Sequence, residues 1–434
     1  MEAFQTAMNR APIVERSVPV AILPELETPG GSLFLSNLDQ LFVVMVPVVY
    51  FFDRSDANTV DMLKRALSKV LVPYYPVAGR LAKNSQGKFT VDCGKKLGVP
   101  FVEALANFNI EHPGDMHLID PDVSRKLIYT DPIETKLEDA ALLTAQVMKF
   151  RCGGFTVGIL LNHCIFDGVS VMNFMNSWAE LARGKPVSII PSHERTLLKS
   201  RVPPQITAAY EAFVPVNDVS NLTGLYKEEQ IVRRSFHFNS EKLAILKKMA
   251  TADERATGSI SSFIVLAALT WRARSMAPKM KPHQPSKPLV AVDCRAMLKP
   301  PVPSHFGNAV GGACCLCLAG ELINEPISST TGRVKKATER VDEEYVRSWI
   351  DSSEMYGIDA SSSSLLVLTS WQRLGSTDFG WGNPRHFGCG PPPENICVVL
   401  PEGGERKGIV LILSLPLSAM NTFEKLLEFS TCEP

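Results

Sequence analysis

The sequence predicts an α/β protein built from two domains. Its 434 residues, 45% of them hydrophobic, exceed what one ordinary core holds. Residues 155–161 form a nearly unbroken apolar run, which is typical of a buried strand, and residues 168–182 carry apolar side chains at helical spacing. Helical and strand-like patterns alternate in both halves of the chain, so we expect a similar architecture in each.

The first half gives clear signals for only some of its elements. A first strand is expected within 41–52, a helix at 56–71, a strand at 88–92, and a hairpin formed by 143–151 and 155–161. Two prolines and a glycine make residues 73–80 irregular. Residues 105–140 are rich in proline and aspartate and show no clear pattern.

Between residues 185 and 226 the periodicity fails, and Pro191, Pro203, Pro204 and Pro215 interrupt the chain, which indicates a linker. We therefore predict an N-terminal domain at 1–185, a linker at 186–226 and a C-terminal domain at 227–434. The second half is expected to contain helices at 241–250, 261–276, 332–350 and 419–429, and strands at 288–293, 365–371, 396–400 and 409–415.

Composition narrows the class of protein. The formal net charge is zero, so no overall field favours nucleic acid or an anionic membrane. The start of the chain lacks a signal-peptide pattern, and the longest apolar run, at 41–52, is too short to span a bilayer. We expect a cytoplasmic protein without a membrane segment. Nucleophile-elbow, zinc-protease, Walker and dinucleotide motifs are absent from the sequence.

The ten cysteines are expected to be reduced, and most of them lie in apolar segments. Cys314, Cys315 and Cys317 form one cluster, but a second ligand pair at zinc spacing is missing. We therefore expect no metal site.

His163 is the first candidate for a chemical role. It follows the apolar strand at 155–161 directly, and open α/β sheets place ligand sites at the carboxyl ends of strands. An imidazole there is a candidate general base. The alternative is a structural histidine bonded to a carbonyl or carboxylate, and the spacing to Asp167 (H-x-x-x-D) is common by chance.

Several motifs together resemble the plant BAHD acyltransferases, over about residues 15–430. They are His163-Cys-Ile-Phe-Asp-Gly168, Asp378-Phe-Gly-Trp-Gly382, Tyr75-Pro-Val-Ala-Gly-Arg80, Thr369-Ser-Trp371 and Phe306-Gly-Asn308. The resemblance implies two chloramphenicol-acetyltransferase-like domains with mixed β-sheets flanked by helices. It also implies an active-site channel at their interface, entered by acyl-CoA from one end and by the acceptor from the other.

The family roles give expectations for individual residues. His163 would take the proton of the acceptor as its oxygen or nitrogen attacks the thioester, with no covalent acyl-enzyme. Trp371 or Thr369 would donate a hydrogen bond to the developing oxyanion, although core packing at a strand end explains either residue as well. Asp167 would point away from the site and pair with an arginine that holds the histidine loop.

The remaining assignments are structural or concern CoA. Gly380 and Gly382 would allow a tight turn between domains, with Asp378 paired to Arg295. Ser261 and Ser262 would meet the adenosine end of CoA, and the segment at Asn308 would approach the pantetheine arm. Helix capping and a simple turn are the alternatives for these three CoA contacts. No permanently bound cofactor is expected, because acyl-CoA is a co-substrate.

Residues 143–147, 149–156, 176–178 and 415–420 resemble members that transfer hydroxycinnamoyl (feruloyl or caffeoyl) groups to long-chain hydroxy acids and alcohols. Between Arg347 and Arg373 the sequence contains no arginine to hold a shikimate or quinate carboxylate. We therefore expect an apolar alcohol as acceptor. We also expect a monomeric enzyme. A small alcohol, an amine, or a non-catalytic role in lipid elongation are the alternatives.

Overall fold

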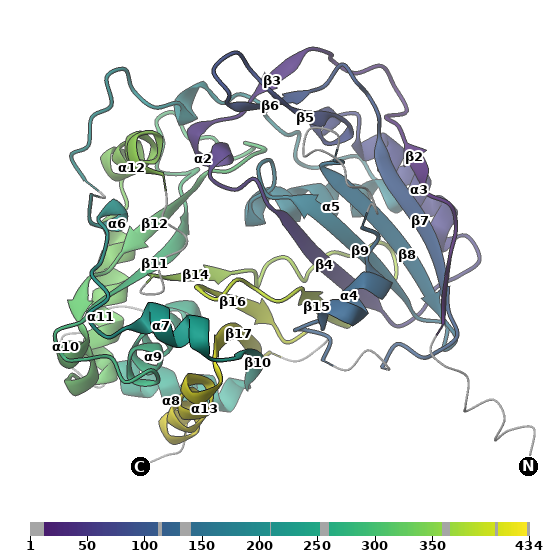
Figure 1. Ribbon diagram of the computed structural model, residues 1–434. Coiled ribbons are helices and arrows are strands. Elements are labelled where there is room, and N and C mark those ends of the chain that lie inside the picture. The colour runs from purple at the N-terminus through teal and green to yellow at the C-terminus, as the bar shows by residue number, and fades with distance from the viewer. Residues whose placement is uncertain are drawn as a thin grey trace, which may run out of the picture.

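The computed structural model describes residues 13–111, 115–130, 140–208, 210–251, 260–357, 365–403 and 407–431. Two seven-stranded sheets and one three-stranded sheet organise these residues (Figure 1). Both large sheets are mixed and carry helices, as the sequence predicts. No helix in the described ranges is long and apolar enough to cross a bilayer.

The N-terminal sheet has the strand order β1-β7-β8-β9-β4-β15, with β2 beside β7. Its strands are β1 (Val14–Arg16), β2 (Val20–Ile22), β4 (Met45–Phe52), β7 (Val99–Ala106), β8 (Leu143–Phe150), β9 (Phe155–Asn162) and β15 (His386–Cys389). Among the described strands of this sheet, only β7 and β8 pair in parallel. The predicted hairpin is confirmed, because β8 and β9 are antiparallel from Leu143 opposite Leu161 to Lys149 opposite Phe155.

Two helices, α3 (Thr59–Val70) and α5 (Gly168–Ala182), pack together against the N-terminal sheet. Their apolar faces and the strands beneath them form what we call the N-terminal core, which includes the buried side chains of Tyr50, Leu67, Phe155 and Trp178. The indole of Trp178 donates to the Leu63 carbonyl oxygen at 2.9 Å, which joins the two helices. On the other face lies α4 (Pro121–Leu127), through Leu127.

The small sheet comprises β3 (Ser32–Phe34), β6 (Phe89–Asp92) and β5 (Arg80–Lys83). The short helix α2 (Asn37–Gln40) follows β3, and the 3₁₀ helix η2 (Tyr75–Ala78) precedes β5. The irregular segment predicted at 73–80 is therefore a 3₁₀ turn that leads into an edge strand.

The C-terminal sheet has the order β10-β17-β16-β14-β11-β12, with β13 beside β11. Its strands are β10 (Ile231–Phe238), β11 (Pro285–Asp293), β12 (Val310–Cys314), β13 (Cys317–Leu318), β14 (Leu365–Ser370), β16 (Ile396–Pro401) and β17 (Ile409–Pro416). Strand β14 pairs in parallel with both β11 and β16. Helices α8 (Ser240–Ala250), α9 (Ser262–Met276), α10 (Ala319–Asn324), α11 (Ile327–Glu339) and α13 (Leu417–Thr431) gather beside this sheet (Figure 1).

One strand connects the two halves. Strand β15 follows β14 in the chain, yet it pairs with β4 in the N-terminal sheet, with Phe387 opposite Tyr50 (Figure 1). Buried side chains from β16 and β17, including Val398 and Ile412, also belong to the N-terminal core. The sequence boundary predicted at residue 227 therefore does not separate two independent cores.

The predicted helix at 332–350 is wrong in extent, because two helices occupy this region. Helix α11 ends at Glu339, and α12 (Glu343–Tyr356) begins after Asp342, whose side chain accepts from the Tyr345 N–H at 2.8 Å. An aspartate N-cap starts a new helix, which the continuous charge pattern concealed. α12 also buries Val346, Trp349 and Ile350, so it is not merely a surface helix.

The predicted linker is ordered where it is described, and part of it is buried. It contains the 3₁₀ helix η3 (Thr196–Leu198), α6 (Tyr210–Phe213) and most of α7 (Leu222–Glu228). The Ser192 N–H donates to the Ser304 carbonyl, and the Phe306 N–H donates to the Ser192 carbonyl. These bonds bring Arg195, which is only 3% exposed, against the chain that leads into β12.

Candidate active site

His163 lies where β9 leaves the N-terminal sheet. Its backbone N–H donates to the Val44 carbonyl at 2.8 Å, which fixes the residue beside the loop before β4. The imidazole is half-buried, and the Phe42 ring stacks on it with the ring centroids 4.7 Å apart. The ring is therefore supported on one side and is not sealed within the core.

Asn308, from the C-terminal half, is the hydrogen-bond partner of this imidazole. Its Oδ1 lies 3.1 Å from His163 Nδ1, and its Nδ2 donates to the His163 carbonyl at 2.8 Å. Within the described ranges, His163 Nε2 makes no hydrogen bond. The histidine thus lies at the meeting point of the two halves, with one ring nitrogen held and the other available.

Burial lowers the pKa of His163 from its ordinary value of 6.5. The hydrogen bond that the imidazole donates to its own backbone, the charge of Asp167, the hydrogen bond to Asn308 and the charge of Asp39 act in the opposite direction but do not offset burial. A lowered pKa keeps the imidazole neutral at pH 7, which is the state that a proton acceptor needs.

Asp167 forms a buried ion pair with Arg295 and has no hydrogen bond to the imidazole among the described residues. Oδ2 of Asp167 lies 2.9 Å from Arg295 Nη1, and the two side chains are 1% and 3% exposed. The carboxylate also accepts from the Ser170 and Ala309 N–H groups. Burial alone would raise the pKa of Asp167, but attraction to Arg295 and these hydrogen bonds outweigh it and lower that pKa. The pairing with an arginine is the contact that was expected for Asp167.

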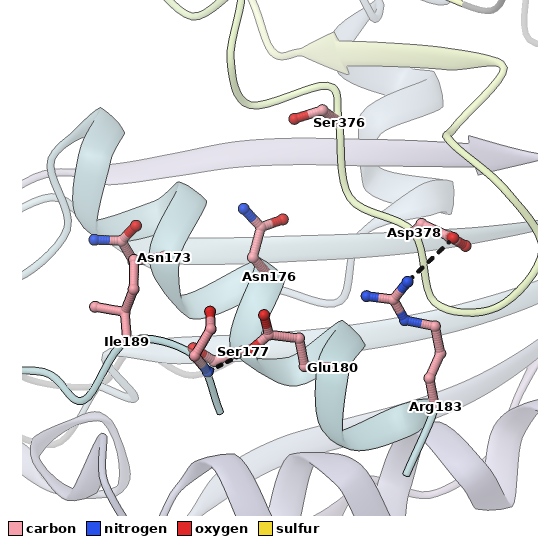
Figure 2. A pocket seen from close by; sticks show the side chains of 9 residues that line it. Asn173, Asn176, Ser177, Glu180, Arg183, Ile189, Ser376 and Asp378 are labelled. Carbon is pink, nitrogen blue, oxygen red and sulfur yellow. Dashed lines mark hydrogen bonds and ion pairs between the residues drawn. The ribbon is translucent and has the colours of Figure 1, made fainter. Parts of the chain in front are cut away.

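The predicted pairing of Asp378 with Arg295 is wrong. Arg295 is engaged by Asp167 and Asp293, whereas Asp378 lies 3.3 Å from Arg183 at the end of α5 (Figure 2). Sequence reasoning chose the wrong arginine because it could not foresee that α5 ends beside the Asp378 turn.

The turn itself agrees with the prediction for its glycines. Gly380 and Gly382 have φ angles of +115° and +86°, which side chains other than glycine rarely adopt. Both of their N–H groups donate to Asp378 Oδ1, at 2.7 and 2.9 Å. Phe379, between them and Asp378, is fully buried against Trp178. The motif therefore fastens a tight turn to α5.

This turn gives a first testable prediction. Asp378→Ala removes the acceptor of two N–H groups and the partner of Arg183, so unfolding free energy should fall by about 1–2 kcal/mol. Chemical denaturation measures this loss, and Arg183→Ala should cost less because it leaves both glycine N–H bonds intact. A large drop in kcat of fully folded Asp378→Ala enzyme would contradict the structural role.

A hollow of about 290 Å³ lies beside this turn, along α5 (Figure 2). Asn173, Asn176, Glu180, Arg183 and Asp378 contribute to its polar lining. His163 is not among the lining residues, so the hollow is separate from the candidate active site.

The two residues predicted to bind the oxyanion lie at the end of β14. Thr369 is half-buried and pairs with Val398 of β16, while the Trp371 N–H donates to the Val399 carbonyl at 2.8 Å. The half-buried Trp371 packs against the N-terminal core. Within the described ranges neither residue hydrogen-bonds to His163, and the Trp371 indole N–H makes no hydrogen bond.

The three residues predicted to contact CoA lie in different surroundings. Ser261 is exposed and caps α9, because its hydroxyl accepts from the Ile264 N–H at 3.3 Å. Ser262 is the half-buried first residue of that helix. Asn308 is fully buried, and its backbone N–H and side-chain amide are engaged by Asp39 and His163. The structure thus places Asn308 beside the imidazole.

Sequence reasoning missed three residues around His163: Phe42, Asp39 and Arg195. Asp39 lies in a Ser-x-x-Asp capping pattern, which could have revealed its local role in α2 but not its distant partners. No comparable sequence signal marks Arg195 within the proline-rich linker. Among the described residues, no cluster of His, Cys, Asp or Glu could hold a metal ion.

Solved structures share this architecture. Vinorine synthase matches 96% of the chain and 98% of its own length, with a TM-score of 0.74 and 24% identity. The F. graminearum TRI101 complex with coenzyme A and T-2 mycotoxin matches 91% of this chain and 97% of its own chain, with a TM-score of 0.73 and 16% identity. At these identities the likeness concerns the fold.

A family model described as the Transferase family matches residues 14–430, so the fold and the site define a transferase. An Arabidopsis thaliana omega-hydroxypalmitate O-feruloyl transferase is 42% identical over 95% of this chain and 92% of its own length. A fatty alcohol:caffeoyl-CoA acyltransferase from the same plant is 40% identical over 96% of this chain and 98% of its own length. The chain belongs to the BAHD acyltransferase family, whose members use CoA thioesters as co-substrates.

Proposed function

We propose that this enzyme transfers a hydroxycinnamoyl group from its CoA thioester to an apolar, long-chain alcohol, with His163 as general base. The observation that carries the proposal is the His163 ring itself, which is held at Nδ1 and has no partner at Nε2 among the described residues, between the two halves of an acyltransferase fold. The donor and acceptor classes are those in the names of the two Arabidopsis thaliana relatives.

In this mechanism His163 Nε2 accepts the hydroxyl proton while the acceptor oxygen attacks the thioester carbonyl. A carbon–oxygen bond forms, the carbonyl electrons move to the oxygen, and their return breaks the carbon–sulfur bond. The imidazolium then returns the proton to the departing CoA thiolate. Because transfer of the proton accompanies attack, no free alkoxide has to form at neutral pH.

The oxyanion needs a hydrogen-bond donor, and the end of β14 offers one. The Trp371 indole N–H is uncommitted among the described residues, and the Thr369 hydroxyl is half-buried at the same strand end. A donor aimed at such an oxygen contributes about 3–4 kcal/mol to transition-state stability in other enzymes. We assign this role to Trp371 first and to Thr369 second.

The surroundings of His163 favour an apolar acceptor. Phe42 stacks on the ring, and Val44, whose carbonyl binds the His163 N–H, is 54% exposed. An exposed valine whose backbone adjoins that of His163 supports a hydrocarbon acceptor over a polyol. No arginine lies between Arg347 and Arg373 to pair with an acceptor carboxylate.

CoA is expected to meet the second domain at the start of α9. Ser261 is exposed there, and the N-terminus of this 15-residue helix carries partial positive charge. Ser261 and Ser262 can offer hydroxyl groups to the adenosine end of CoA at that position.

A pH profile tests the protonation state of the base. The pKa of His163 lies below 6.5 in the folded protein, so the neutral imidazole prevails at and above that pH. We expect kcat/KM to be level from neutral to mildly alkaline pH and to fall as pH drops below the lowered pKa. A profile that instead rises steeply above pH 7 would contradict a neutral His163 as the base.

The decisive experiment is a panel of donors and acceptors with purified protein. We expect release of free CoA thiol, and formation of ester, from feruloyl-CoA or caffeoyl-CoA with omega-hydroxypalmitate and fatty alcohols. Shikimate, benzyl alcohol and simple amines are the comparison acceptors. Faster transfer to any of these would overturn the acceptor class, and absence of transfer to every acceptor would favour a non-catalytic role.

A further inference from the structure

We propose that Asp39 is a positioning residue for catalysis: it fixes the side-chain amide of Asn308, which in turn fixes the tautomer of His163. This inference rests on the proposed role of His163 as general base. Asp39 lies in α2, far in sequence from Asn308, and nothing in its local sequence connects it with the imidazole.

The Asp39 carboxylate is completely buried and divides its contacts between its two oxygens. Oδ2 lies 2.9 Å from Nε of Arg195, which is 3% exposed, and 2.9 Å from the Ser36 N–H. Oδ1 accepts from the Asn308 backbone N–H at 2.7 Å and from Asn308 Nδ2 at 3.0 Å. One oxygen therefore serves the local turn and the ion pair, and the other serves Asn308.

The direction of the Asn308 amide follows from which groups can donate. A carboxylate paired with a guanidinium only accepts hydrogen bonds, so the NH₂ group of Asn308 must face Asp39. The same NH₂ group donates to the His163 carbonyl, at 2.8 Å. The amide oxygen is then the atom that lies 3.1 Å from His163 Nδ1.

The tautomer of the imidazole follows in the same way. An amide oxygen only accepts, so His163 Nδ1 must carry the hydrogen. In a neutral imidazole the other nitrogen, Nε2, then has the lone pair that takes the acceptor proton. With the amide reversed, its NH₂ group would face Nδ1 and favour the tautomer whose Nε2 carries a hydrogen and cannot act as base.

A purely local role does not account for these contacts. Asp39 completes a capping box with Ser36 in a helix of only four residues, and that box uses Oδ2 alone. Burying a charged pair is a costly way to stabilise a fold, because desolvation offsets most of the attraction. The contacts of Oδ1 instead control the side chain that is hydrogen-bonded to the catalytic ring.

Asp167 provides a matched control, because it contacts the same segment of chain as Asp39, next to Asn308. It is 1% exposed, pairs with Arg295, and bonds to the backbone of Ala309, next to Asn308. Asp167 has no hydrogen bond to the Asn308 side chain among the described residues. Asp39→Asn and Asp167→Asn thus make the same isosteric change in two equally buried pairs, and only the first touches the amide.

The test is a pair of double-mutant cycles, each with Asn308→Ala, using any acyl-CoA and alcohol that the enzyme turns over. We expect Asp39→Asn to lower kcat roughly 10- to 100-fold, the usual effect of losing an outer partner that orients a histidine. Its KM for acyl-CoA should change less than about threefold. In the Asn308→Ala background, Asp39→Asn should add little further loss, whereas Asp167→Asn should have the same effect in both backgrounds.

Independent losses for Asp39→Asn and Asn308→Ala would overturn the proposal, as would activity that falls only with the folded fraction. If Asp39→Asn does not fold, nitrogen NMR of the histidine-labelled wild type decides. A neutral His163 with its hydrogen on Nε2 contradicts the proposal, and one with its hydrogen on Nδ1 supports it. Full activity in His163→Ala would instead refute the general base, so the two failures are distinguishable.

Discussion

We expect His163→Ala to lower kcat by about 10²- to 10⁴-fold, because the variant loses the group that removes the acceptor proton during attack. The KM for acyl-CoA should change little, since the thioester does not depend on the imidazole for binding. Steady-state release of CoA thiol, with the ester product quantified in parallel, gives both constants.

His163→Gln is the control for this variant. Glutamine retains a polar side chain that can bond to Asn308, but it cannot accept a proton at neutral pH, so its activity should be as low as that of alanine. Near-normal transfer by either folded variant would remove His163 from the mechanism. Thiol release without ester formation would indicate hydrolysis in place of transfer.

Asp167→Ala should produce the largest loss of stability, about 3–5 kcal/mol, because it leaves the Arg295 guanidinium buried without its partner. Urea denaturation measures this loss of unfolding free energy, with Glu339→Ala as the control variant. Glu339 is 61% exposed in a surface pair with Lys335, and its removal should hardly change the unfolding midpoint. Equal midpoints for both variants would contradict the structural role of Asp167.

The same ion pair predicts a pH dependence of stability. The pKa of Asp167 is lowered in the folded protein, so its contribution is complete above the ordinary value of 3.8 and is lost as pH falls through the lowered value. Wild-type protein should lose stability in acid, and Asp167→Ala should lose less of it over the same range.

Local patterns predicted most of the individual elements. The apolar run at 155–161 is β9, and the helical spacing after His163 is α5. The break between α11 and α12 was missed because a polar N-cap at Asp342 resembles the charged helix around it. Strand β7 was missed because residues 99–106 lie next to a stretch without clear periodicity.

Long-range partners could not be predicted in the same way. The chain has 45 basic and 45 acidic side chains, and sequence alone does not state which two meet. Asp378 was therefore given the wrong arginine, and the hydrogen bond between Asn308 and His163 was not predicted. His163 itself was predictable because its position depends on a local feature, the end of a buried strand.

The pairing of β15 with the N-terminal sheet has a consequence for how this protein can be synthesised and engineered. The edge of β4 that pairs with β15 has no neighbour until residues 386–389 have left the ribosome. Most of the chain must therefore be made before that sheet is complete. Until then an open strand edge is exposed to pairing with other chains. A chimaera that exchanges the C-terminal half with a relative also exchanges this strand, and with it part of the first half's core.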